Sequence, residues 1–180
     1  MPLKSVDHRW LENVPVSQRG LQVWDSVELY VKKIQSKQLP KPTNKSFDVV
    51  SQAVKDKLIR AKLEFFCFTA TILQLFLANY ETYKPMVPIM VDDLTTVIKC
   101  LIQKVVKPEV LDQATTPEKL LRIDLEKTNL LTYKKVDISL LAEEKLRSAT
   151  ISEMEVMEFR MECRVCVIEV LKTITVKSPV

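Results

Sequence analysis

The cysteines are the first residues in this sequence whose type and spacing could do chemistry. The 180-residue chain has four, and two of them, Cys163 and Cys166, form a C-x-x-C pair. A zinc site would need a second pair of ligands at comparable spacing, but the chain offers no second C-x-x-C and only one histidine, His8. The pair also falls inside a long predicted helix, where nothing lowers a thiol pKa. We therefore predict no metal site and free thiols buried on apolar helix faces, with the same expectation for Cys67 and Cys100.

Carboxylate pairs are the next candidates for chemistry. Neighbouring acids occur at Asp92-Asp93, Asp124 with Glu126, and Glu143-Glu144. Catalytic carboxylates must converge from separate elements onto one metal or substrate. Asp92 is more simply a helix N-cap, and Glu143-Glu144 a solvated face. Because His8 lies in a polar segment, no serine or cysteine nucleophile has an oriented base. Taken by themselves, these residues thus suggest no catalytic set.

Glycine scarcity excludes several further classes of site. Gly20 is the only glycine in the chain. Loops that cradle phosphates need several glycines for tight turns and close backbone approach. A dinucleotide fingerprint, a Walker loop and a nucleophile elbow are therefore excluded, and no cofactor or small-molecule substrate is expected. Hairpin-rich β folds are also disfavoured, because their preferred turns use glycine.

Arg9 and Trp10 are the residues that could contact nucleic acid. The chain is mildly basic, with 27 Lys and Arg against 23 Asp and Glu and a net charge of +4, and its basic residues are scattered. Scattered charge favours an ordinary solvated surface. However, Arg9-Trp10 lies in a polar segment where an aromatic side chain has little reason to be buried. Arginine can bind phosphate and tryptophan can stack on a base, so Arg9, Trp10 and Arg19 form a candidate nucleic-acid site.

The elements that would position these residues are predicted to be helices. Apolar residues recur at helical spacing over about 17–38, 46–56, 58–80, 93–106, 137–147 and 152–174. The N-caps expected are Ser17, Ser46 and Asp92, with Thr116-Pro117 opening a short helix and Ser152–Glu155 forming a capping box. We predict one all-α domain over 1–180, an irregular bundle of five or six helices around the apolar helix at about 58–80, with an irregular segment over 1–16.

The most apolar helix could be either a core helix or a membrane span. Its nearly uninterrupted apolar run, Phe65 to Ala78, is 14 residues long and includes Gln74. A span needs about 20 apolar residues. We therefore expect a core helix with its four phenylalanines buried, and no membrane partner.

Short strings along most of the chain resemble a known family. They begin at Arg9-Trp-Leu-Glu-Asn-Val-Pro-Val16 and continue with Ala61-Lys-Leu-Glu-Phe-Phe66, Lys84-Pro-Met-Val-Pro88, Asp92-Asp-Leu94, Val106-Lys-Pro-Glu-Val-Leu111 and Glu158-Phe-Arg-Met-Glu-Cys163. Together they resemble the helical insertion of hAT-type transposases and of transposon-derived animal proteins. The resemblance implies an all-α region in which an Arg-Trp motif helps to handle a flipped DNA base. Arg9 and Trp10 match that motif in type and position.

The same resemblance implies that the catalytic machinery is missing. In hAT-type transposases, three metal-binding carboxylates belong to an RNase H-like core that the insertion interrupts. The strands bearing the first two would precede Arg9, and the third would follow Val180, so no catalytic residue can be carried over. A BED-type zinc finger has no counterpart in these cysteines. The resemblance therefore implies no enzyme activity, and we expect a fragment of the helical insertion, or a product derived from one.

Two functions from different classes follow from these observations. The first is a non-enzymatic helical module that contacts a protein partner or associates with itself, because apolar helix stripes suit helix–helix packing. The alternative is a residual DNA-binding module that uses Arg9 and Trp10. The first twenty residues contain no apolar signal region, so an intracellular location is expected. A nuclear location follows from the resemblance alone.

Overall fold

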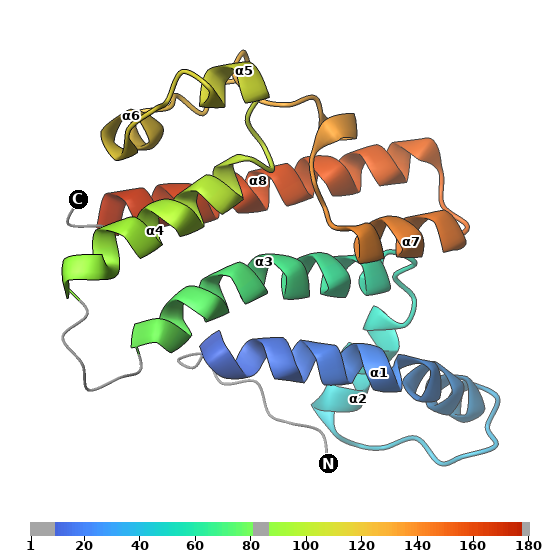
Figure 1. Cartoon of the computed structure of the whole chain (residues 1–180). Coiled ribbons are helices and arrows are strands. Elements are labelled where there is room, and N and C mark those ends of the chain that lie inside the picture. The colour runs from blue at the N-terminus through green and yellow to red at the C-terminus, as the bar shows by residue number, and fades with distance from the viewer. Residues whose placement is uncertain (1–9, 81–86, 178–180) are drawn as a thin grey trace. The chain divides into compact units, whose positions relative to one another are not determined.

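The computed structural model describes residues 10–80 and 87–177. Over these ranges the chain forms eight α-helices and one short 3-10 helix (Figure 1). They are α1 (Trp10–Gln35), α2 (Lys45–Ala53), α3 (Ile59–Tyr80), α4 (Val87–Ile102), α5 (Pro108–Leu111), α6 (Pro117–Leu121), η1 (Tyr133–Lys135), α7 (Leu140–Ser148) and α8 (Glu153–Lys177). The described ranges contain no strand, only an isolated bridge between Val106 and Leu130. The all-α fold class is therefore confirmed; α6 is the short helix expected at Thr116-Pro117, and α5 is a further single turn.

The described chain divides into two compact units. The first comprises residues up to Cys67 together with Leu140–Ile151, and the second comprises Phe68–Ser139 together with the residues from Ser152 onward. Helix α3 enters both, because the boundary falls between Cys67 and Phe68. The expectation of one domain over 1–180 stays a prediction.

The first unit packs α2 against the end of α1. Val31, Ile34 and Phe47 form a buried cluster, and Val54 packs against it. Helix α2 begins where Asn44 accepts a hydrogen bond from the amide of Phe47 at 2.9 Å. The N-cap is thus Asn44 and not Ser46, because the asparagine side chain reaches the third amide of the helix.

An ion-pair cluster joins α1 to the start of α3 within the first unit. The guanidinium of Arg60 binds Asp25, and its Nη2 lies 3.1 Å from Oε1 of Glu28. Trp24 is buried and donates from Nε1 to the same Glu28 oxygen at 2.6 Å. Two carboxylates on α1, one of them also held by Trp24, therefore fix where Arg60 sits, and with it the first turn of α3.

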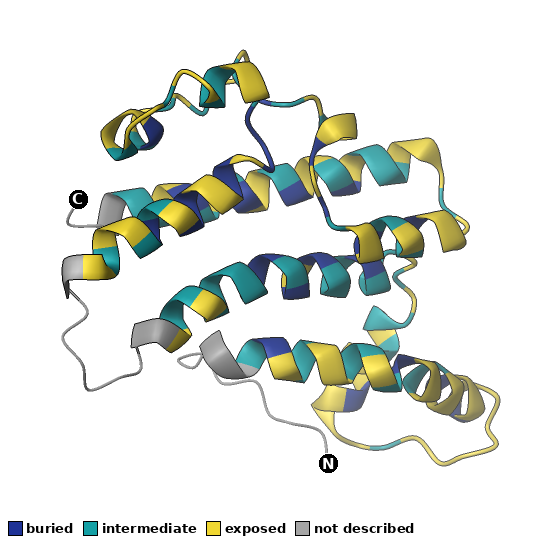
Figure 2. Ribbon diagram, viewed as in Figure 1, coloured by how far each residue is buried: buried dark blue, intermediate teal, exposed yellow. Residues whose placement is uncertain are grey.

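The second unit is built on the pair of α4 and α8, which pack along each other. The α4 stripe predicted from the sequence is buried: Leu94, Val97, Ile98, Leu101 and Ile102, followed by Val105. The matching side of α8 buries Phe159, Cys163, Val167 and Leu171, which follow one another every four residues. Figure 2 shows buried positions recurring along both helices.

Two helices begin earlier than predicted. Helix α1 starts at Trp10 and contains Pro15, so residues 10–15 are helical and Ser17 is not a cap. Helix α4 starts at Val87, with Pro88 in its first turn where a missing N–H costs nothing, and Asp92 is an internal residue. By contrast, Thr116 caps α6 as expected and the Ser152–Glu155 box opens α8.

Helix α3 confirms the predicted apolar helix, but only part of its surface is buried. By length and composition, the stretch Ile59–Ala78 could cross a membrane, with a mean hydropathy of 1.5. Phe65 is buried, whereas Phe66 and Leu75 are exposed. The expectation that its four phenylalanines are buried is wrong for Phe66, because adjacent residues of a helix point about 100° apart, and Phe68 and Phe76 are only half-buried.

Candidate interaction surface

The predicted nucleic-acid residues are only partly described by the structure. Arg9 lies outside the described residues, and Trp10 is the first residue of α1, with its side chain undescribed. Arg19 is exposed on α1, and its Nη1 donates to Oε1 of Gln22 at 3.2 Å. The Arg9–Trp10–Arg19 site therefore stays a prediction. The irregular backbone assumed for Trp10 is corrected to helix.

The cysteines show two environments, not one. Cys67 and Cys163 are buried, as predicted, whereas Cys100 and Cys166 are exposed. The correction for Cys166 follows from helix geometry: a spacing of three residues turns the chain by about 300°, which carries Cys166 to the edge of the buried side. Burial raises the pKa of Cys163 to about 12 and also raises the pKa of Cys67, and the partial loss of water around the otherwise exposed Cys166 raises its pKa too. None of these three is an activated thiol.

Carboxylates and thiols do not converge in the part of the chain that the structure describes. Within it, no group of three or more His, Cys, Asp or Glu side chains could hold a metal ion.

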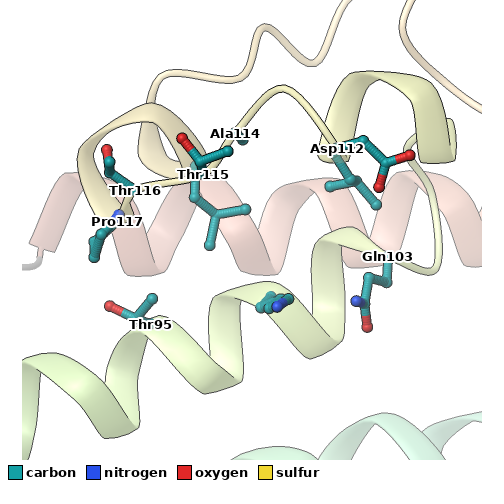
Figure 3. Close-up of a pocket in the computed structure, with 10 residues that line it drawn as sticks. Thr95, Gln103, Asp112, Ala114, Thr115, Thr116 and Pro117 are labelled. Atoms are coloured by element: carbon teal, nitrogen blue, oxygen red, sulfur yellow. The ribbon is translucent and has the colours of Figure 1, made fainter.

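A polar pocket of about 440 Å³ lies between α4 and the segment that leads into α6. Figure 3 shows Thr95 on α4 and Gln103 just after its end facing the stretch from Asp112 to Pro117. Two of its hydroxyls are engaged locally: Thr95 donates to the carbonyl of Val91, and Thr116 accepts from the amide of Lys119. The two charged side chains that line the pocket, Lys99 and Asp112, have opposite signs. This lining selects no single ligand chemistry.

A second hollow, of about 540 Å³, lies on the solvent side of α8. We call its surroundings the outer face of α8, defined by Met154, Glu158, Met161, Glu162, Val165 and Cys166; the last five line the hollow. Met154 is 65% exposed, Met161 40% and Val165 56%. Three large apolar side chains on one helix are therefore open to water. Their spacings of seven and four residues place them along one stripe.

Helix α8 has this exposed stripe because it is apolar on two opposite sides. Two residues of separation turn a helix by about 200°, so Met161 points about 160° away from Phe159. Phe159 lies on the side that is buried within the second unit. A helix that is apolar all round normally has both sides covered. In α8 the second side is exposed.

The arginines of α8 point away from the outer face. Nη1 of Arg164 donates to the carbonyl of Leu131 at 3.0 Å, and Nη1 of Arg160 donates to the carbonyl of Val136 at 3.2 Å. These contacts hold the segment around η1 against α8. Consequently, every exposed charged side chain of α8 between residues 153 and 169 is a glutamate: Glu153, Glu158, Glu162 and Glu169.

The outer face of α8 was not predicted from the sequence, although a signal for it exists. Met154 and Met161 are seven residues apart, and Val165 follows four later, which is the spacing of a helix–helix seam. The same stretch also contains the spacing that buries Phe159 and Cys163. Sequence periodicity detects a helix face only when an apolar side contrasts with a polar side. Two apolar stripes on one helix remove that contrast, so neither is evident from the sequence.

Comparison with known proteins adds no assignment to these features. No protein-family model, curated protein or solved structure matches the chain.

Proposed function

We propose that this chain is a non-enzymatic helical module that binds another protein through the outer face of α8. The observation that carries the proposal is the exposure of Met154, Met161 and Val165 along one stripe of a helix whose opposite side is already packed.

Association with another protein would bury these side chains, as folding has buried the side chains on the opposite side of α8. Each large apolar side chain that moves from half-exposed to buried contributes about 1 kcal/mol. Side chains of this type at the centre of a contact supply much of its binding energy, while a polar rim excludes water. Glu158 and Glu162 stand beside the apolar stripe in the position of such a rim.

The resemblance to the helical insertion of hAT-type transposases is part of this proposal. It rests on the sequence strings given above. In the part of the chain that the structure describes, the exposed apolar stripe of α8 is the surface that another chain would cover. Under this proposal the module contributes contacts and no strand-transfer chemistry.

The test is a charge substitution in the stripe with a matched control. Val165→Glu places a carboxylate in the outer face of α8, and Val49→Glu does the same at an exposed valine of α2. We would measure self-association by sedimentation, and binding of three amphipathic helical peptides, basic, neutral and acidic, by fluorescence anisotropy. We expect binding of at least one of these partners, lost in Val165→Glu and kept in Val49→Glu. If nothing binds, or if both variants lose binding equally, the outer face of α8 is not an interaction surface.

A further inference from the structure

We infer that the partner of the outer face of α8 is a basic amphipathic helix. This inference rests on the proposed function and names the chemistry of its partner. Three observations carry it: the charge of the face, the length of its apolar stripe, and the poor fit of a second copy.

The charge of the face is segregated by the fold. The arginines of α8 could have paired with its glutamates. Instead, Arg160 and Arg164 donate hydrogen bonds to the carbonyls of Val136 and Leu131. Glu158 and Glu162 remain exposed at the edge of the hollow, in a chain whose net charge is +4. An acidic strip on a basic protein gives orientation and a faster encounter to a partner of opposite sign.

The length and spacing of the stripe fit a helix. From Met154 to Val165 is eleven residues, or about 16 Å at 1.5 Å per residue. The half-buried Ile168 extends the stripe by one more step of three residues. An amphipathic helix of three to four turns with apolar residues at the same spacing would cover this length. Lysines or arginines flanking its apolar residues would then lie beside Glu158 and Glu162.

A second copy of the same face fits less well. A two-fold contact places one surface patch against itself. Glu158 and Glu162 of both copies would then share one seam with Met161, and like charges at this range repel each other. Lys172, a basic residue in the C-terminal part of the helix, already pairs with Glu169 at 2.8 Å. Self-pairing through this face would therefore concentrate negative charge without neutralising it.

The test uses three synthetic helical peptides and the full chain. Each peptide has about 21 residues, or about six turns, with leucines in one register. The remaining positions are lysine in the first, glutamine in the second and glutamate in the third. We expect the lysine peptide to bind at least about tenfold more tightly than the glutamine peptide at about 50 mM salt. The two affinities should approach each other at about 500 mM salt.

Two sets of variants separate the charge from the apolar stripe. Glu158→Gln with Glu162→Gln should remove most of the preference for lysine. The control pair, Glu109→Gln with Glu126→Gln, removes two exposed carboxylates elsewhere and should leave the preference unchanged. Val165→Ser should weaken the lysine and glutamine peptides alike, because it removes apolar contact and no charge.

The outcomes distinguish this inference from the function on which it rests. If lysine and glutamine peptides bind equally well and both respond to Val165→Ser, the face binds a helix but not a basic one. If the chain instead forms a dimer that Val165→Ser disrupts, the partner is a second copy. Equal effects of the two glutamate pairs would show attraction to the protein as a whole, and would overturn the inference. No binding by any peptide, with a monomeric chain, would remove the proposed function as well.

Discussion

At the scale of single residues, Lys104 carries the most consequential contacts of the second unit. It is 7% exposed, its Nζ lies 3.0 Å from Oδ2 of Asp137, and the same nitrogen lies 3.6 Å from the centre of the Phe68 ring. Asp137 in turn accepts from the amide of Ser139 at 3.0 Å, where the backbone turns with a φ of 81°. A buried ammonium requires such partners, because an unpaired charge is costly away from water.

The first prediction compares the two ends of this pair. Asp137→Asn keeps the size of the side chain and an oxygen for Ser139, but leaves the buried ammonium without a counter-charge. We expect a loss of about 1–3 kcal/mol in the free energy of unfolding. Lys104→Met leaves a half-exposed carboxylate that water can solvate, so we expect a loss below about 1 kcal/mol. Urea unfolding of both variants measures the difference. A larger loss in Lys104→Met would mean that the contact with Phe68 dominates.

The second prediction concerns Cys163 and alkaline pH. Its pKa in the folded chain is about 12, because burial penalises the thiolate, whereas a cysteine in the unfolded chain has a pKa of about 8.5. Between these values the unfolded state binds fewer protons than the folded one, so stability falls as pH rises. Relative to Cys163→Ala, the native chain should lose up to about 1.4 kcal/mol per pH unit from about pH 9 toward 12. If the free energies of unfolding of the two proteins change in parallel with pH, the fold does not protect Cys163 from deprotonation.

At the scale of elements, the start of α8 is fixed by two side chains. The amide of Ser152 donates to Oε2 of Glu155 at 2.7 Å, and the amide of Glu155 donates to Oγ of Ser152 at 3.2 Å. This reciprocal pair satisfies two amides that the helix cannot satisfy itself. It also orders the turn that carries Met154, the first residue of the outer face of α8.

The third prediction removes one half of this box. Ser152→Ala should cost about 1 kcal/mol of stability and accelerate amide exchange in the first turn of α8, because the amide of Glu155 loses its acceptor. Ser26→Ala, at an exposed position inside α1, is the control and should change stability by less than about 0.5 kcal/mol. Hydrogen exchange read by mass spectrometry locates the change. Equal exchange in the first turn of native and variant protein would contradict the cap.

The elements were predictable where one physical signal acts alone. The stripe of α4 has a polar opposite side, so its periodicity indicated the buried face correctly. The box at Ser152 consists of local hydrogen bonds, which the sequence also reveals. The starts of α1 and α4 were missed because the caps were placed at Ser17 and Asp92, whereas both helices begin earlier and contain Pro15 and Pro88. The outer face of α8 was missed for a different reason, since its stripe overlaps the stripe that is buried.

At the scale of the whole molecule, the net charge is mildly positive, so DNA is the alternative partner to test. Our fourth prediction is that a short DNA hairpin leaves the light-scattering mass of the chain unchanged across a salt series. Basic residues that are scattered should not bind several phosphates at once. A complex that forms at low salt and dissolves as salt rises would favour the DNA-binding alternative. In that case Trp10→Ala should weaken hairpin binding by about 1–3 kcal/mol if a base stacks on the indole.

The division into two units also has a consequence for how the chain is made. Neither unit is a continuous stretch: Leu140–Ile151 belongs with the N-terminal residues, and the residues from Ser152 onward belong with Phe68–Ser139. A ribosome must therefore synthesise most of the second unit before α7 emerges to join the first. During that interval α1, α2 and the start of α3 are present without α7, so the first unit remains incomplete. Both units then become complete only after the chain beyond Leu140 has been synthesised.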